Sequence, residues 1–156
     1  MTTRTVTHAT FVIERTYPAS PGRVFAAWAS VEIKSRWFGD PSNPDPNYQL
    51  DFQVGGREMN RGGPIGGPIF TFDARFQEIV QGERIAFSYT MDMDATRISL
   101  SLATIEFRAD GGATRMTYTE MGAYFDGHDQ PQFREHGTGV LLDNLGAYLE
   151  RQSTDA

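Results

Sequence analysis

The segment FVIERTYPASPGRVFAAWAS, residues 11–30, decides the first half of the fold. Its start, residues 10–17, is rich in alternating β-branched and aromatic side chains, which predicts a strand. Pro18 ends this strand, and Ser20-Pro21 supplies an N-cap hydroxyl followed by a proline suited to the first helical position. A short amphipathic helix is therefore expected, with three apolar residues on one stripe: Val24, Phe25 and Trp28.

Downstream of this segment, the pattern predicts a second short helix that begins at Ser30 and ends at Gly39, where a left-handed residue would be needed. The prolines and short polar side chains of residues 40–47 cannot sustain a helix and indicate a loop. Alternation over residues 50–54 predicts a strand, and residues 57–61 could form its return strand.

Two longer hairpins follow. Phe70 to Met91 forms the first, with its turn at Gln81-Gly82. The second runs from residue 98 to residue 121 around Asp110-Gly111-Gly112, because these three residues tolerate positive φ at little cost.

The chain ends in its longest predicted helix, residues 132–152, in which six apolar residues recur near helical spacing: Phe133, Val140, Leu141, Leu145, Tyr148 and Leu149. Gly137, Gly139 and Gly146 weaken it by about 1 kcal/mol each relative to alanine. A sheet wrapped closely around the helix would explain them. The order of strand, two short helices, about six antiparallel strands and a long helix is typical of an α+β fold.

Composition narrows the possible functions. The 156 residues predict one domain over 1–156, with an ordered core at about 10–151. A net charge of -6 gives no general attraction to nucleic acid, and no run of ~18 apolar residues spans a membrane. Without cysteine or a signal peptide, we expect a cytoplasmic protein with no disulfide and no thiolate nucleophile.

Six motifs, in order along the chain, resemble the AHSA1-like proteins, relatives of the C-terminal domain of the activator of Hsp90 ATPase within the SRPBCC (START/Bet v 1-like) superfamily. They are FVIERTYPASPGRVFAAWAS at 11–30, SRWFGD at 35–40, DFQVGGR at 51–57, FQEIVQGERIAFSY at 76–89, GGATRMTYTEMG at 111–122 and LLDNLGAYL at 141–149.

This resemblance implies a helix-grip fold, in which a curved antiparallel sheet of six or seven strands grips the C-terminal helix and leaves a cavity between them. Superfamily members hold lipids, sterols, polyketides or hormones there, and some catalyse cyclisation or condensation. Two positions depart from the family pattern: Thr138 stands where a tryptophan is frequent, and Glu120-Met121-Gly122 replaces an expected His-Glu-Gly.

Three residues are candidates for proton transfer: Glu120, Tyr118 and His136. Met116, Tyr118 and Glu120 share one strand face, which would direct a phenol and a carboxyl into the cavity. We favour the alternative that Glu120 lies at the strand end, in water or paired with an arginine, because unpaired Glu is rarely buried. His136 could relay protons at the cavity mouth, but we favour a surface position beside Arg134 and Glu135.

The other candidates are ligand contacts, although most of these rings could simply fill a core. The predicted ligand-binding residues are Trp37, Phe38, Phe72, Phe76, Phe87, Tyr89, Met116, Tyr118, Glu120, Phe125 and Leu141. Arg57, Arg61 and Arg75 could meet a carboxylate or pair with outer-face acids. Asp92 and Asp94 lack the rest of a calcium loop, and the three histidines lack ligand spacing, so neither a metal nor a cofactor is expected.

The leading hypothesis is therefore a protein that binds a hydrophobic or aromatic small molecule in an internal cavity. A cyclase or dehydratase that uses Glu120, Tyr118 or His136 is the alternative. Co-chaperone action on an Hsp90-type ATPase ranks lowest, because no second domain is present to clamp a large partner. A homodimer stays an open alternative.

Overall fold

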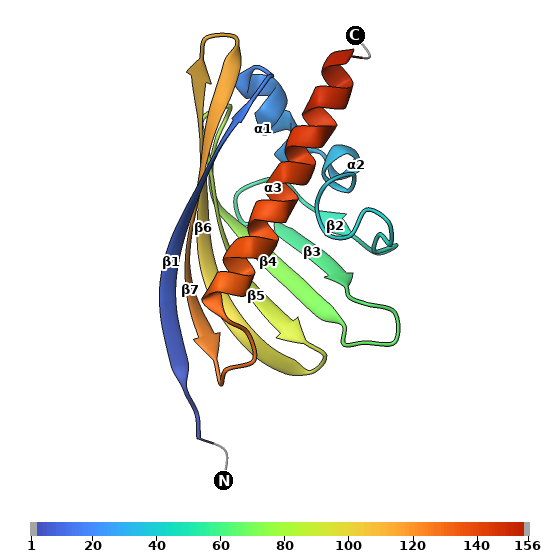
Figure 1. Cartoon of the computed structure of the whole chain (residues 1–156), viewed down its shortest axis with the longest axis vertical. Helices are drawn as coiled ribbons and strands as arrows, with labels where there is room; N and C mark the ends of the chain where they lie inside the picture. The colour runs from blue at the N-terminus through green and yellow to red at the C-terminus, as the bar shows by residue number, and fades with distance from the viewer. Residues whose placement is uncertain (1–2, 155–156) are drawn as a thin grey trace.

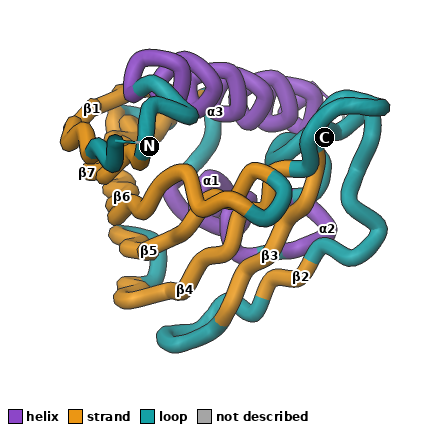
Figure 2. The backbone as a smooth tube through the Cα atoms, turned by 90° about the horizontal axis from the view of Figure 1, so that it is seen from below, coloured by secondary structure: helices purple, strands orange, loops and turns teal. Residues whose placement is uncertain are grey.

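A curved antiparallel sheet lies against one long helix (Figure 1) in the computed structural model, which describes residues 3–154. Within that range the elements are β1 (Val6–Tyr17), α1 (Pro21–Ala29), α2 (Val31–Lys34), β2 (Gln49–Leu50), β3 (Arg57–Gly62), β4 (Phe70–Val80), β5 (Arg84–Met93), β6 (Thr96–Asp110), β7 (Ala113–Phe125) and α3 (Pro131–Thr154). The sheet order is β1-β7-β6-β5-β4-β3-β2. Figure 2 shows α3 across the open side of the sheet. The predicted α+β helix-grip fold is confirmed.

The first strand is longer than predicted. β1 begins at Val6, not at residue 10, because it pairs with β7 along its whole length, from Val6 opposite Phe125 to Tyr17 opposite Thr114. Strand pairing satisfies the backbone of polar residues such as Thr7 that carry no apolar signal of their own. No helix within residues 3–154 has the length and apolar character needed to cross a membrane.

The two short helices form where their caps predict. The Ser20 hydroxyl accepts a hydrogen bond from the Arg23 N–H, and the apolar stripe of α1 is buried. The regular part of α2 is shorter than expected and ends at Lys34, after which turns lead to Gly39. Gly39 has the predicted left-handed backbone, with φ 74°.

The strand predicted over residues 50–54 is wrong for most of its length, since β2 stops at Leu50. The N–H of Gln53 bonds to Asp51 O at 2.9 Å and that of Gly56 bonds to Gln53 O at 2.8 Å, so the backbone closes two tight turns. This turn directs the Phe52 ring onto Phe25 and Phe76 in the core. The alternation of apolar and polar residues over 50–54 therefore reflects burial of the Phe52 ring in a turn, and not an extended strand.

The helix α3 approaches the sheet closely at Gly146. A Cβ atom there would lie 3.2 Å from the Tyr17 ring, whose hydroxyl donates a 2.8 Å hydrogen bond to Leu142 O. The expected reason for a glycine in this helix, close approach of the sheet, is thus found at Gly146. Gly137 differs, because a Cβ atom at that position would meet nothing within 4 Å and the space beside it is open.

A buried ion pair joins α2 to β3. Lys34 Nζ lies 2.8 Å from Glu58 Oε1, and both side chains are 1% exposed. The Tyr48 hydroxyl also donates to Glu58, and the Lys34 ammonium lies 4.6 Å from the centre of the Phe38 ring. Burial lowers the pKa of Lys34, and the Glu58 carboxylate partly offsets that effect. This pair anchors the segment that carries Trp37 and Phe38.

Breaking this pair will destabilise the protein strongly. We expect Lys34→Met or Glu58→Gln to lower the free energy of unfolding by about 3–5 kcal/mol, because each leaves an uncompensated buried partner. The double variant is expected to recover part of that loss. Glu78→Gln is the matched control, since the Arg84–Glu78 pair is about half exposed and worth about 0–1 kcal/mol. Urea unfolding of the wild type and these four variants measures the changes in the free energy of unfolding. Equal losses for Glu58→Gln and Glu78→Gln would contradict the prediction.

Candidate ligand-binding pocket

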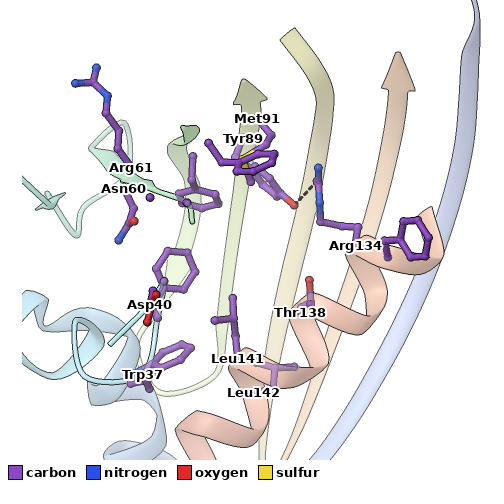
Figure 3. Close-up of a pocket in the computed structure, with 18 of the residues that line it drawn as sticks. Trp37, Asp40, Asn60, Arg61, Tyr89, Met91, Arg134, Thr138, Leu141 and Leu142 are labelled. Atoms are coloured by element: carbon purple, nitrogen blue, oxygen red, sulfur yellow. Dashed lines mark hydrogen bonds between the residues drawn. The ribbon is translucent and has the colours of Figure 1, made fainter. Parts of the chain in front are cut away.

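A pocket of about 400 Å³ opens between α3 and the concave face of the sheet. Strands β3, β4 and β5 form its floor, the first half of α3 forms one side, and the segment after α2 forms the other (Figure 3). Its wall is mainly apolar and includes the aromatic rings of Trp28, Trp37, Phe38, Phe72, Phe87 and Tyr89. The pocket lies where the resemblance places the family cavity.

Strand alternation explains why the floor is aromatic. Phe72 on β4 lies opposite Met91 on β5, and the same face of β5 carries Phe87 and Tyr89 two residues apart. The Phe72 and Tyr89 rings pack with their centres 4.7 Å apart. Trp37 is held at the opposite wall, where its indole N–H donates to Ala27 O at 3.1 Å. These contacts within the protein shape the wall.

Seven of the predicted ligand-binding residues line the pocket: Trp37, Phe38, Phe72, Phe87, Tyr89, Tyr118 and Leu141. Their part in ligand contact stays a prediction. Four others lie outside the lining. Phe76 and Met116 are buried deeper in the core, and Glu120 lies behind the hydroxyls of two tyrosines. Phe125 is on the opposite side of β7, because Glu120 and Tyr124 have the inward parity and residue 125 does not.

The structure places His136 on the surface, as the favoured interpretation has it, and the candidate role at the cavity mouth is wrong. The residue is exposed and borders a shallow surface groove with Val12 and Asp143. Arg134 and Thr138 face the pocket instead (Figure 3). A helix turns about 100° per residue, so residue 136, two positions from each of them, points to the other side.

The acid on β7 is neither at the strand end nor in water. Glu120 is 0% exposed, since β7 continues to Phe125 between β1 and β6. Its carboxylate accepts the Tyr118 hydroxyl at 2.7 Å and the Tyr89 hydroxyl at 2.8 Å, and Arg134 Nη1 lies 3.8 Å away. The expectation of an arginine partner is therefore right, but the partner meets Glu120 inside the protein.

Arg134 is the site residue that sequence reasoning missed. Its side chain is 9% exposed and donates to Tyr89 Oη and Ser99 Oγ, each at 2.8 Å, and to Asp129 Oδ2 at 2.9 Å. The guanidinium also lies 5.3 Å from the Tyr124 ring centre.

The sequence does contain a signal for the inward position of Arg134, in the spacing of residues along the last helix. The residues at 134, 138, 142, 145 and 149 form one inward stripe. The apolar residues Phe133 and Val140 obscure this stripe in the sequence, because they are 66% and 45% exposed. A charged residue on an otherwise uncharged, buried stripe marks a buried polar site.

Burial governs the titration of this polar end. It raises the pKa of Glu120, although hydrogen bonds from Tyr118 and Tyr89 and the charge of Arg134 oppose the shift. Burial also raises the pKa of Tyr118 well above 10, and the neighbouring Glu120 charge adds to that. The tyrosines are therefore neutral hydrogen-bond donors at physiological pH.

The remaining candidates have ordinary roles in the structure. Arg57 makes a two-pronged pair with Asp73 on the outer face, and Arg75 donates to Gly55 O, while Arg61 lies on the rim of the pocket. Among residues 3–154, no three His, Asp or Glu side chains are placed to share a metal ion.

A curved antiparallel sheet around a long C-terminal helix defines the class of α+β helix-grip proteins, and comparison with known proteins identifies the family. Residues 18–150 match the model of the family described as activator of Hsp90 ATPase homolog 1-like protein, and the chain belongs to this AHSA1-like family of SRPBCC proteins. No curated protein matches the chain.

Solved structures from rhizobia are similar over nearly the whole chain. A protein from Rhizobium leguminosarum is 41% identical with a TM-score of 0.92, covering 96% of this chain and 99% of its own. One from Rhizobium loti is 47% identical with a TM-score of 0.86, covering 92% and 99%. A protein of the dynemicin biosynthetic locus shares the fold at 16% identity and a TM-score of 0.66, over 90% of this chain and 47% of its own.

Glu120 will make the free energy of unfolding depend on pH, with a contribution that falls as the pH rises. Its pKa is raised above the ordinary 4.5, so between 4.5 and the folded-state pKa the folded protein binds more protons than the unfolded chain. The free energy of unfolding contributed by Glu120 therefore falls as pH rises through this window. Subtracting the value for Glu120→Gln from that of the wild type, by urea unfolding from pH 4 to 8, should give a difference that decreases with pH. A difference that is flat or rises would contradict the assignment.

Proposed function

We propose that the protein binds a hydrophobic or aromatic small molecule in the pocket between α3 and the sheet. The observation that carries this proposal is the pocket itself, because about 400 Å³ falls within the roughly 300–1,000 Å³ of small-molecule sites. Aromatic walls with a few polar groups at one end are typical of such sites. Membership of a family with a ligand-binding fold supports it.

Small side chains keep the space open. Gly137 and Thr138 lie on the pocket side of α3, directly across from the rings of β4 and β5. Protein interiors pack at crystal-like density and leave few voids larger than a water molecule, so an apolar space of this size is not an ordinary packing defect. The rings of the wall already pack on one another, which reduces the entropy lost on binding.

Filling the pocket from the helix should abolish binding. We expect Thr138→Trp to weaken the binding of the neutral fluorescent probe N-phenyl-1-naphthylamine at least about tenfold, because the indole would occupy the ligand volume. His136→Trp is the matched control, since it adds the same ring to the exposed side of α3 and should bind like the wild type. Fluorescence titration measures both, with circular dichroism to verify folding. Equal affinity in a folded Thr138→Trp protein would refute the proposal.

A second candidate function is acid–base catalysis of the cyclase or dehydratase kind. The observation that favours it is the contact between Tyr118, which lines the pocket, and buried Glu120. Such reactions start with loss of a proton beside a carbonyl, when the C–H electron pair forms a C=C bond and the oxygen becomes an enolate. Tyr118 would take that proton while passing its own to Glu120. The raised pKa of Tyr118 makes this step costly, so catalysis ranks below binding.

Hydrogen exchange tests this second function directly. If Glu120 receives protons, the wild type should speed deuterium uptake by the methyl group of 2-acetylnaphthalene in D2O, followed by proton NMR. Glu120→Gln should lose most of the acceleration, about 10²–10⁴-fold for one acid–base group. His136→Ala serves as control and should retain the full rate. Uptake no faster than in buffer alone would eliminate catalysis of this kind but leave binding intact.

A further inference from the structure

Arg134 is fixed on the pocket wall before any ligand arrives. Its guanidinium donates to Tyr89, Ser99 and Asp129, which come from β5, β6 and the loop before α3. The Tyr89 and Tyr124 rings flank it, with centres 5.6 and 5.3 Å away. Figure 3 shows the group at the end of the pocket formed by the start of α3. A donor held by three elements is preorganised to orient a ligand.

Hydrogen-bond donors are in surplus at this end. Arginine has five N–H donors, and the three hydrogen bonds to Tyr89, Ser99 and Asp129 use three of them. The carboxylate acceptors, by contrast, are engaged. Each Glu120 oxygen accepts a tyrosine hydroxyl, and the two Asp129 oxygens accept Arg134 and the Gln130 N–H. A ligand group that accepts but need not donate is therefore complementary to this end.

The charge of Arg134 is already balanced. Asp129 Oδ2 lies 2.9 Å from Nη2, and Glu120 Oε2 lies 3.8 Å from Nη1. With Glu120 protonated the cluster has no net charge, and with Glu120 ionised it is negative. A ligand carboxylate would be a further carboxyl group around one guanidinium in a poorly hydrated site, where repulsion between like charges is large.

We propose that the pocket selects an uncharged ligand whose carbonyl oxygen accepts a hydrogen bond from Arg134, while its apolar or aromatic body lies against the rings of β4 and β5. This inference rests on the proposed function, since it names the chemical class of the ligand. Aromatic ketones, quinones and lactones belong to this class, and fatty acids and other carboxylates do not. The Arg134 side chain is only 9% exposed, so a hydrogen bond from this cation contributes strongly to selectivity.

Three naphthalene probes of nearly equal shape test the proposal with the whole protein. 2-Acetylnaphthalene has the carbonyl, 2-isopropylnaphthalene lacks any oxygen, and 2-naphthoate has a carboxylate. Calorimetric titration of the wild type should find the ketone bound about tenfold more tightly than the hydrocarbon, since hydrogen bonds to charged groups are the strong ones. The naphthoate should bind more weakly than the ketone. Arg134→Met should remove the preference for the ketone over the hydrocarbon.

A spectroscopic measurement keeps the test valid if Arg134→Met fails to fold. The ¹³C-labelled carbonyl of the ketone should move downfield on binding to the wild type, as a hydrogen bond to the oxygen requires. Tightest binding of the naphthoate, or equal binding of ketone and hydrocarbon without a ¹³C shift, would overturn the inference and leave the proposed function standing. Failure of all three probes to bind would refute the proposed function and the inference with it.

Discussion

The contact between Gly146 and the Tyr17 ring determines how closely the last helix approaches the sheet. Because Gly146 has no side chain, the second half of α3 lies directly on the end of β1. The Tyr17 hydroxyl donates a hydrogen bond to the helix backbone at Leu142 O. The sheet curves away from this anchor (Figures 1 and 2), so the first half of α3 stands off from β4 and β5. The pocket is the space left between them.

The polar cluster at the other end of α3 depends on this arrangement. Glu120 points inward because of its parity on β7, and the helix brings Arg134 to meet it together with Asp129. Buried carboxylates are costly unless they are paired and hydrogen-bonded, and both conditions are satisfied here by two tyrosines and one arginine. The cluster therefore secures the start of α3 and also supplies the polar end of the pocket.

The reliable predictions from sequence were those that depend on neighbouring residues. The Ser20 cap, the left-handed Gly39 and the hairpins at residues 82 and 111 each follow from local backbone chemistry. The strand predicted over residues 50–54 failed beyond Leu50, because alternation over a few positions also fits a turn that buries one ring. The phase of α3 failed for a similar reason, since apolar Phe133 is exposed and charged Arg134 is buried.

By itself, the amino-acid sequence determined the order of the elements, the inward face of Met116, Tyr118 and Glu120 on β7 and the need for close packing around the last helix. Local backbone preference and side-chain periodicity are properties of adjacent residues, so they are readable without a fold. Only the tertiary structure decided that Arg134 meets Glu120 and that His136 does not, because residues on different elements are brought together by the curvature of the sheet and the rotation of the helix about its axis.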